Sequence, residues 1–237
     1  MIVGTVYGNL YCYDLFSLDP LWMEQISEMG SEINVASVIV ASDNKIFFYD
    51  NQGTLYCRSA ANGMLIWVMN ASQGGWRIGS KVSNSVNKNN IIIKDNDLIL
   101  VDDSGNLFCI DALLGVSKWN MKNLFANGII RTKEKQELIL PTTTNKIVIV
   151  STKFGKVTNE FELPIDRDNE SITDLQIINE NILVSFSDGW IYKIKAKQKA
   201  EKFFRGGLAP VVSLTEIDGN CLVTDYDGKL TLLRLSP

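Results

Sequence analysis

The chain has 237 residues, of which 46% are hydrophobic and 21% are charged, and this balance suits a globular protein of one large domain or two small ones. The formal net charge of −4 argues against a surface that binds nucleic acid or anionic membranes. Histidine is absent, which removes the commonest general base and metal ligand and so disfavours most hydrolases and metalloenzymes.

The N-terminal segment, MIVGTVYGNLYCYDLF, alternates like a β-strand. It has no basic region and lacks the continuous apolar run of a signal peptide. No segment reaches the roughly 18 consecutive apolar residues that a membrane-spanning helix needs. We therefore predict a cytoplasmic protein without a membrane span.

A repeat begins in this first segment, and three copies align without gaps at Gly8–Trp22, Gly53–Trp67 and Gly105–Trp119. Each copy starts with Gly and has Leu at plus two, an aromatic residue at plus three, Cys at plus four and Trp at plus fourteen. Looser copies follow, at spacings of about 40 to 50 residues that match one four-stranded propeller blade. The six anchor residues are Gly8, Gly53, Gly105, Asn145, Gly189 and Gly228.

Each anchor lies between predicted strands. Apolar runs before the anchors are divided by polar turns such as 42–44, 94–96 and 179–181, and Asp-Gly pairs then favour a tight hairpin. The strand after the anchor is followed by a turn and an outer strand that carries Trp. We therefore predict an all-β fold, a β-propeller of about six four-stranded antiparallel blades, as a single domain over residues 1–237.

The two ends of the chain predict incomplete terminal blades. The N-terminal segment reads as the second strand of a blade, and the last blade stops after its third strand at Leu235. Three explanations remain open: a ring that closes with thin terminal blades, a protein partner that supplies strands by edge addition, or a longer parent chain.

The motif Gly-x-Leu-aromatic-small-x-Asp, followed by Gly and Trp, resembles the pyrroloquinoline-quinone-like (PQQ-like) propeller repeat. The Asp of the motif is present as Asp14 and Asp111, whereas the second copy has Ser59. The resemblance implies a propeller fold. It leaves function open, because such repeats occur both in quinoprotein dehydrogenases and in non-catalytic scaffolds.

The cysteines read as buried structural thiols. Cys12, Cys57 and Cys109 share one repeat position and so belong to different blades, and Cys221 lies in an apolar strand. The chain has no C-x-x-C pair, so we predict neither a zinc site nor any other bound metal.

Four residues are candidate contacts for a partner. Trp76 and Arg77 lie in the longest interval between blades, and the alternative for Trp76 is packing inside the fold. Trp190 takes a plus-one position that is polar in other copies, with packing against a neighbouring loop as its alternative. Arg205 lies in the segment FFRGGLAP, whose glycines can also serve only to turn the chain between blades.

Between these residues, the run KIKAKQKAEK at 193–202 reads as a solvated edge strand, or as a site for an acidic partner. The chain carries no phosphate-binding loop and no nucleophile elbow. The sequence thus favours a propeller without catalytic activity or cofactor, which acts as a protein-interaction scaffold or complex subunit. A ligand-sensing propeller is the alternative, and a quinoprotein-type dehydrogenase ranks below it.

Overall fold

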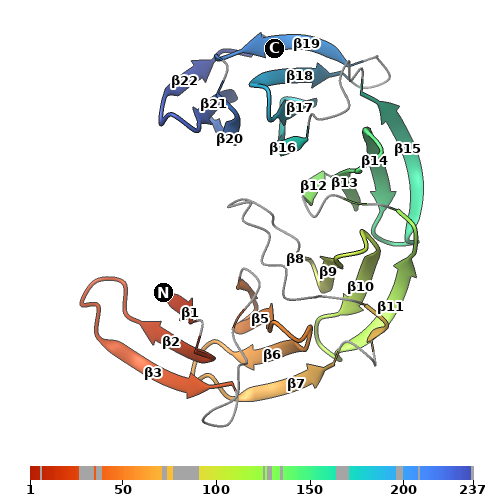
Figure 1. Ribbon diagram of the computed structural model, residues 1–237. Helices are drawn as coiled ribbons and strands as arrows, with labels where there is room; N and C mark the ends of the chain where they lie inside the picture. The colour runs from red at the N-terminus through yellow and green to blue at the C-terminus, as the bar shows by residue number, and fades with distance from the viewer. Residues whose placement is uncertain are drawn as a thin grey trace. The chain divides into compact units, whose positions relative to one another are not determined.

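The computed structural model describes residues 1–5, 7–26, 35, 39–70, 74–76, 91–124, 126, 130–133, 136–163, 171–195, 200–207 and 209–235. The chain divides into two compact units. The first unit comprises residues 1–82 and 89–123, and the second comprises residues 83–88 and 124–237. Within the residues just given, each unit contains three antiparallel sheets, and each sheet corresponds to one blade of the repeat (Figure 1).

In the first unit, the blades consist of β1 (Ile2–Gly4), β2 (Asn9–Tyr13) and β3 (Pro20–Gln25); β4 (Val40–Ser42), β5 (Lys45–Tyr49), β6 (Leu55–Ser59) and β7 (Leu65–Met69); and β8 (Ile91–Lys94), β9 (Asp97–Val101), β10 (Leu107–Asp111) and β11 (Val116–Met121). In the second unit, they consist of β12 (Arg131–Lys133), β13 (Glu137–Pro141), β14 (Lys146–Ser151) and β15 (Lys156–Glu162); β16 (Ile172–Ile178), β17 (Asn181–Phe186), β18 (Trp190–Ile194) and β19 (Glu201–Arg205); and β20 (Val211–Ile217), β21 (Asn220–Asp225) and β22 (Leu230–Leu233).

Strands that are consecutive in the chain are neighbours in every described sheet, as the repeat predicts. The turns between the first two strands of a blade use left-handed backbone conformations, with φ of 47° and 59° at Asp43 and Asn44 and of 54° at Asp95. Such angles suit two-residue hairpins and are best tolerated by Asp, Asn and Gly. Asn179 and Glu180 adopt the same conformation, at φ of 47° and 64°. The three turns predicted between these strands are therefore confirmed.

The two terminal blades have three strands each in the part of the chain that is described. β2 begins one residue after the anchor Gly8 and β22 begins two residues after the anchor Gly228, so each occupies the third position of its blade. The first blade thus has no counterpart of the usual first strand, and the last blade has none of the usual fourth strand. The repeat predicts this arrangement of six blades that lack two strands in total. The three explanations for the two absent strands stay open.

Hydrophobic side chains fill the space between neighbouring blades within each unit. Phe47 and Tyr49 on one face of β5 pack toward Leu98 and Phe108 of the third blade. The alternate residues of β5, represented by Phe48, pack with residues of the first blade. This alternation buries both faces of the sheet, because successive side chains of a strand point to opposite sides.

The repeated Trp of the outer strands β3 and β7 connects each of these blades to the next. Trp22 Nε1 donates a hydrogen bond to the Ala60 carbonyl oxygen at 3.0 Å. Its ring lies against Gly63, where an added Cβ would sit 2.9 Å from Trp22 Cε3. The Trp67 ring repeats this arrangement in the third blade, with its Nε1 bonded at 3.1 Å to the carbonyl oxygen of Ala112. The plus-ten glycine is thus required by the Trp of the preceding blade.

Candidate interaction surface on the fifth blade

The start of β18 and the end of β19 bring Trp190 and Arg205 together. The two residues are direct partners in the antiparallel register of these strands. The Trp190 amide donates a hydrogen bond to Asp188 Oδ1 at 3.1 Å, which closes the turn that leads into β18. The two strands therefore place an aromatic ring and a guanidinium group side by side, although 14 residues separate them in the sequence.

Two cations contact the Trp190 ring. Lys202 Nζ lies 5.1 Å from the ring centroid, and Arg205 Cζ lies 5.5 Å from it. Both cationic residues are exposed, and the ring itself is half-buried. The negative π-face of an indole attracts a cation with about 0.5–1 kcal/mol at an exposed site, so these contacts orient the two side chains. We call Trp190, Lys202 and Arg205 the aromatic-cationic cluster.

The backbone around the cluster is tightly constrained. Gly189 has a φ of 83°, and an added Cβ would lie 2.7 Å from the Gly207 carbonyl oxygen. Only glycine fits such a close approach of two backbone segments. Arg205 Nη2 donates to the Asp188 carbonyl oxygen at 3.4 Å. The chain after β19 is thus held against the turn before β18, and the cluster rests on a defined backbone.

A second aromatic-cationic contact lies farther along the same pair of strands. Lys193 Nζ lies 4.5 Å from the centroid of the Phe203 ring and 3.3 Å from Glu201 Oε1. Lys229 of the sixth blade donates from Nζ to the Gly206 carbonyl oxygen at 3.3 Å. Lys193 thus contacts a different ring from that of the cluster, and Lys229 contacts the backbone after β19, so the cations at the Trp190 ring are Lys202 and Arg205.

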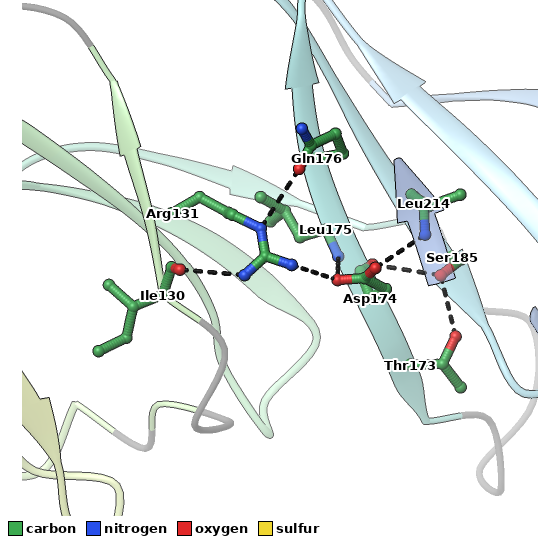
Figure 2. A network of polar contacts seen from close by, with 8 residues as sticks. All are labelled: Ile130, Arg131, Thr173, Asp174, Leu175, Gln176, Ser185 and Leu214. Carbon is green, nitrogen blue, oxygen red and sulfur yellow. Dashed lines mark hydrogen bonds and ion pairs between the residues drawn. The ribbon is translucent and has the colours of Figure 1, made fainter. Parts of the chain in front are cut away.

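A different polar network joins the three blades of the second unit (Figure 2). Arg131 Nη2 lies 2.7 Å from Asp174 Oδ1, and the same oxygen accepts a hydrogen bond from the Leu175 amide at 2.7 Å. Asp174 Oδ2 accepts a hydrogen bond from the Leu214 amide at 2.8 Å. These contacts connect β12, β16 and β20, the first strands of their blades.

Burial governs the electrostatics of this network. Asp174 is only 2% exposed, and its desolvation raises the pKa of the carboxyl group above the usual value. The Leu214 amide, the Arg131 charge and the Leu175 amide act in the opposite direction, because each stabilises the carboxylate. Both carboxylate oxygens already have protein partners, so the network reads as a structural link between blades and offers no open group to a substrate.

The described part of the chain contains no group of three or more Cys, Asp or Glu side chains with the arrangement of a metal site. The same residues include no helix that is both long and apolar enough to cross a bilayer.

Comparison with known proteins places these features in a family. A family model described as the outer membrane protein assembly factor BamB matches residues 1–129 and 34–207. This chain belongs to the PQQ-like repeat family of BamB. The match confirms the resemblance that the Gly-to-Trp motif indicates. None of the curated protein sequences matches the chain.

Solved structures similar to this PQQ-like chain are propellers. BamB from Moraxella catarrhalis has a TM-score of 0.66 and 13% identity over 99% of this chain and 81% of its own length. Sqt1 from Saccharomyces cerevisiae has a TM-score of 0.72 and 14% identity, with 99% and 68% of the two chains covered. The C-terminal WD40 domain of Sif2 has a TM-score of 0.72 and 14% identity, with 98% and 64% covered. These likenesses confirm the all-β propeller fold.

The repeat positions of the PQQ-like family explain the cysteines. All four cysteines are buried and unpaired as thiols, as predicted. Burial raises the pKa of the Cys57 and Cys221 thiols to about 11 and that of Cys109 to about 12. The thiols of Cys57, Cys109 and Cys221 therefore stay protonated near neutral pH, and their reactive thiolate form is suppressed.

The structure corrects the prediction for Trp76. Its ring is 3% exposed, packs edge-on against Phe108 at a centroid distance of 5.7 Å, and donates from Nε1 to the Gly53 carbonyl oxygen at 2.8 Å. Trp76 is thus a core residue of the first unit and is not available to a partner in this structure. Arg77 lies outside the described residues.

The lysine run also differs from its prediction as one edge strand. Lys193 belongs to β18 and Lys202 to β19, so the run spans the hairpin between two strands of the fifth blade. Sequence reasoning singled out Trp190 and Arg205 but missed the position of Lys202 beside them. The hairpin could have indicated this position. β19 runs antiparallel to β18, which begins at Trp190, and so brings Lys202 back toward that residue.

Proposed function

We propose that this propeller is a protein-interaction scaffold that binds an acidic segment of a partner protein through the aromatic-cationic cluster. The observation that carries the proposal is the stacking of two exposed cations, Lys202 and Arg205, over the half-buried ring of Trp190. Tryptophan and arginine are enriched among residues that dominate protein interfaces. The fixed backbone at Gly189 supports binding, because a preorganised site loses little conformational entropy when a partner docks.

The family and the fold agree with this role. BamB is described as an assembly factor for outer membrane proteins, and another similar propeller was solved within a mitotic checkpoint complex. The first description concerns the assembly of other proteins, and the second concerns a protein complex. They support a scaffold role for this chain and leave its own partner to be identified by experiment.

We further propose that the chain has no catalytic role. Histidine is absent from its sequence, and the buried cysteine thiols have raised pKa values. The carboxylate of Asp174 has protein partners on both oxygens. Purified protein mixed with pyrroloquinoline quinone and calcium should not reduce a redox dye with alcohols or sugars; dye reduction would contradict this part of the proposal. The cytoplasmic location stays a prediction, to be checked by cell fractionation.

A binding measurement with two charge-matched variants tests the proposed site. The probe is a dye-labelled synthetic peptide of alternating Glu and Tyr, and the readout is fluorescence anisotropy. Arg205→Glu should weaken binding roughly tenfold or more, because it places a negative charge beside the Trp190 ring. Lys156→Glu changes the net charge equally on the exposed surface of β15, and it should leave the affinity within about twofold.

The outcomes separate a specific site from general charge attraction. Equal weakening by both variants would mean that the peptide follows net charge alone, and the cluster would then not be the docking site. Absence of binding to the unmodified protein at low salt would also refute the site. Trp190→Ala should weaken binding as well, and a melting curve verifies that this variant is folded.

A further inference from the structure

The outer strands of the first unit expose many large apolar side chains. The exposed fractions of these side chains range from 46% at Ile66 to 99% at Phe16. They lie on β3, β7 and β11 and in the turns that precede these strands. We call this set the apolar belt; its members are Leu15, Phe16, Leu18, Leu21, Met23, Met64, Leu65, Ile66, Val68, Leu113, Leu114 and Val116.

The fold itself does not require an apolar outer surface. In the second unit, the outer strand β15 exposes Lys156, Thr158 and Glu160, with Val157 and, in the preceding turn, Phe154 as its exposed large apolar residues. The outer strand β19 exposes charged residues. The two units are built from the same repeat, so blade packing cannot account for the difference between them. A large exposed apolar surface on a soluble domain marks a site of interaction.

Contacts between blades make the belt continuous. The hydrogen bond from Trp22 to Ala60 places β3 against the turn 60–63, which leads directly into Met64 and β7. The hydrogen bond from Trp67 to Ala112 places β7 against the turn that holds Leu113 and Leu114. Apolar side chains of successive blades therefore lie side by side, and a single elongated ligand can span them.

Charge identifies the kind of ligand. Residues 1–82 and 89–123 contain seven Lys and Arg against twelve Asp and Glu, a formal net charge of −5. The remaining residues contain sixteen Lys and Arg against fifteen Asp and Glu, a formal net charge of +1. The acidic excess of the protein thus belongs to the unit that carries the belt.

Two of these carboxylates are fixed inside the belt. Asp14 Oδ1 accepts hydrogen bonds from the backbone amides of Ser17 at 2.9 Å and Phe16 at 2.8 Å. Asp111 Oδ1 accepts equivalent bonds at 2.9 Å from Leu114 and Leu113. These amides lower the pKa of both carboxyl groups, so both are charged near neutral pH. Asp14 therefore presents a negative charge next to exposed apolar side chains. Asp111 and Asp97 share one cation, Lys118, so that group of three keeps a net negative charge beside Leu113 and Leu114.

We propose that the apolar belt binds a basic amphipathic segment of a partner protein. Apolar residues of the segment cover the belt, and its Lys and Arg residues pair with the acidic surface around it. A second copy of the belt is disfavoured as the occupant, because two units of charge −5 repel one another. Anionic lipid is disfavoured for the same reason. This proposal does not depend on the aromatic-cationic cluster.

A synthetic peptide tests the proposal. The probe is a dye-labelled helix of about 18 residues, or five helical turns, with leucines along one face and lysines elsewhere. We expect binding by fluorescence anisotropy, and weaker binding as salt is raised. An analogue with Glu in place of Lys should not bind. Equal binding of both peptides would overturn the assignment of a basic ligand.

Matched variants locate the site. The double variant Phe16→Ser and Met23→Ser removes two exposed belt residues, and it should weaken Lys-Leu peptide binding roughly tenfold or more. The control, Phe154→Ser and Val157→Ser, makes the same type of change at exposed positions of the second unit. An equal loss in both variants would refute the belt as the site, with melting curves verifying that each variant is folded.

Two further measurements separate this proposal from its competitors. Arg205→Glu should leave Lys-Leu peptide binding unchanged, which distinguishes failure of the belt from failure of the aromatic-cationic cluster. In sedimentation, the wild-type protein should not self-associate through the belt. Such self-association, or binding to zwitterionic lipid vesicles that the belt variant abolishes, would assign the belt to a second copy or to a membrane and would overturn the proposal.

Discussion

Removing Arg131 should destabilise the protein through the carboxylate that it leaves behind. Asp174 is 2% exposed, and Arg131 is its cationic partner at 2.7 Å. In the variant Arg131→Met, Asp174 keeps only the Leu175 and Leu214 amides as hydrogen-bond donors. Loss of one partner of a buried ion pair costs about 3–5 kcal/mol. Because two amide donors remain, we expect about 3 kcal/mol near neutral pH.

The pH dependence of this loss follows from the pKa of Asp174. Burial raises that pKa in the folded protein, so folding favours the protonated carboxyl group. Stability contributed by the group is therefore highest below its unfolded pKa and declines as pH rises through the folded pKa. Without Arg131 the folded pKa rises further, since the charge of Arg131 is one of the causes that lower it. The cost of Arg131→Met should thus shrink as pH falls toward about 4.

Urea denaturation followed by circular dichroism measures this cost, and a second substitution tests its cause. Asp174→Asn added to Arg131→Met removes the uncompensated charge while preserving the size of the side chain. The double variant should be more stable than Arg131→Met alone near neutral pH. This expectation is refuted if the double variant is the less stable of the two, or if Arg131→Met is as stable as the wild-type protein. In either case, the uncompensated charge of Asp174 is not a source of instability.

Three other perturbations address the repeat. Gly63→Ala should lower the free energy of unfolding, measured by urea denaturation, by about 2 kcal/mol. The added Cβ would collide with the Trp22 ring, and the φ of 74° at Gly63 is left-handed. Leu18→Gly in the first blade is the control and should not destabilise the protein. Trp22→Phe should cost about 1 kcal/mol by deleting the hydrogen bond to Ala60, and an unchanged midpoint would contradict this. The Cys109 thiol, with a pKa of about 12, should react with a thiol reagent only when urea unfolds the chain; rapid labelling of the folded protein would show that it is accessible.

The blade repeat was predictable because its signals are local. Glycine, aspartate and asparagine at the turns report backbone conformation directly, and the anchors therefore predict every third strand of a blade. The exception at plus ten, where the first blade has Leu18, has its cause in a contact between blades. No Trp from a preceding described blade lies over Leu18, and it adopts a φ of 60° while remaining exposed. In the second and third blades, the plus-ten residues Gly63 and Gly115 are required because the rings of Trp22 and Trp67 lie against them.

The candidate site was only partly predictable, because it depends on strand register. A β-bulge between Ile191 and Tyr192 shifts the pairing of β18 with β19, so the partner of Trp190 cannot be counted from the sequence. Trp76 shows the opposite failure. Its unusual place between blades suggested an exposed contact, yet the Gly53 carbonyl oxygen and the Phe108 ring hold it in the core. Both outcomes were decided by residues distant in the sequence.

The surfaces of the two units can differ in chemistry because packing constrains only some positions of the repeat. The anchors, the buried alternating residues and the outer-strand Trp of the first blades are fixed by packing, so they cannot vary to suit a partner. The exposed residues of the outer strands carry no such constraint. In the first unit many of them are apolar and the unit has an acidic excess, whereas β19 of the second unit is basic and aromatic. From these opposite chemistries on one repeated framework we expect two different ligands, and binding of each should be lost by substitution without loss of the other.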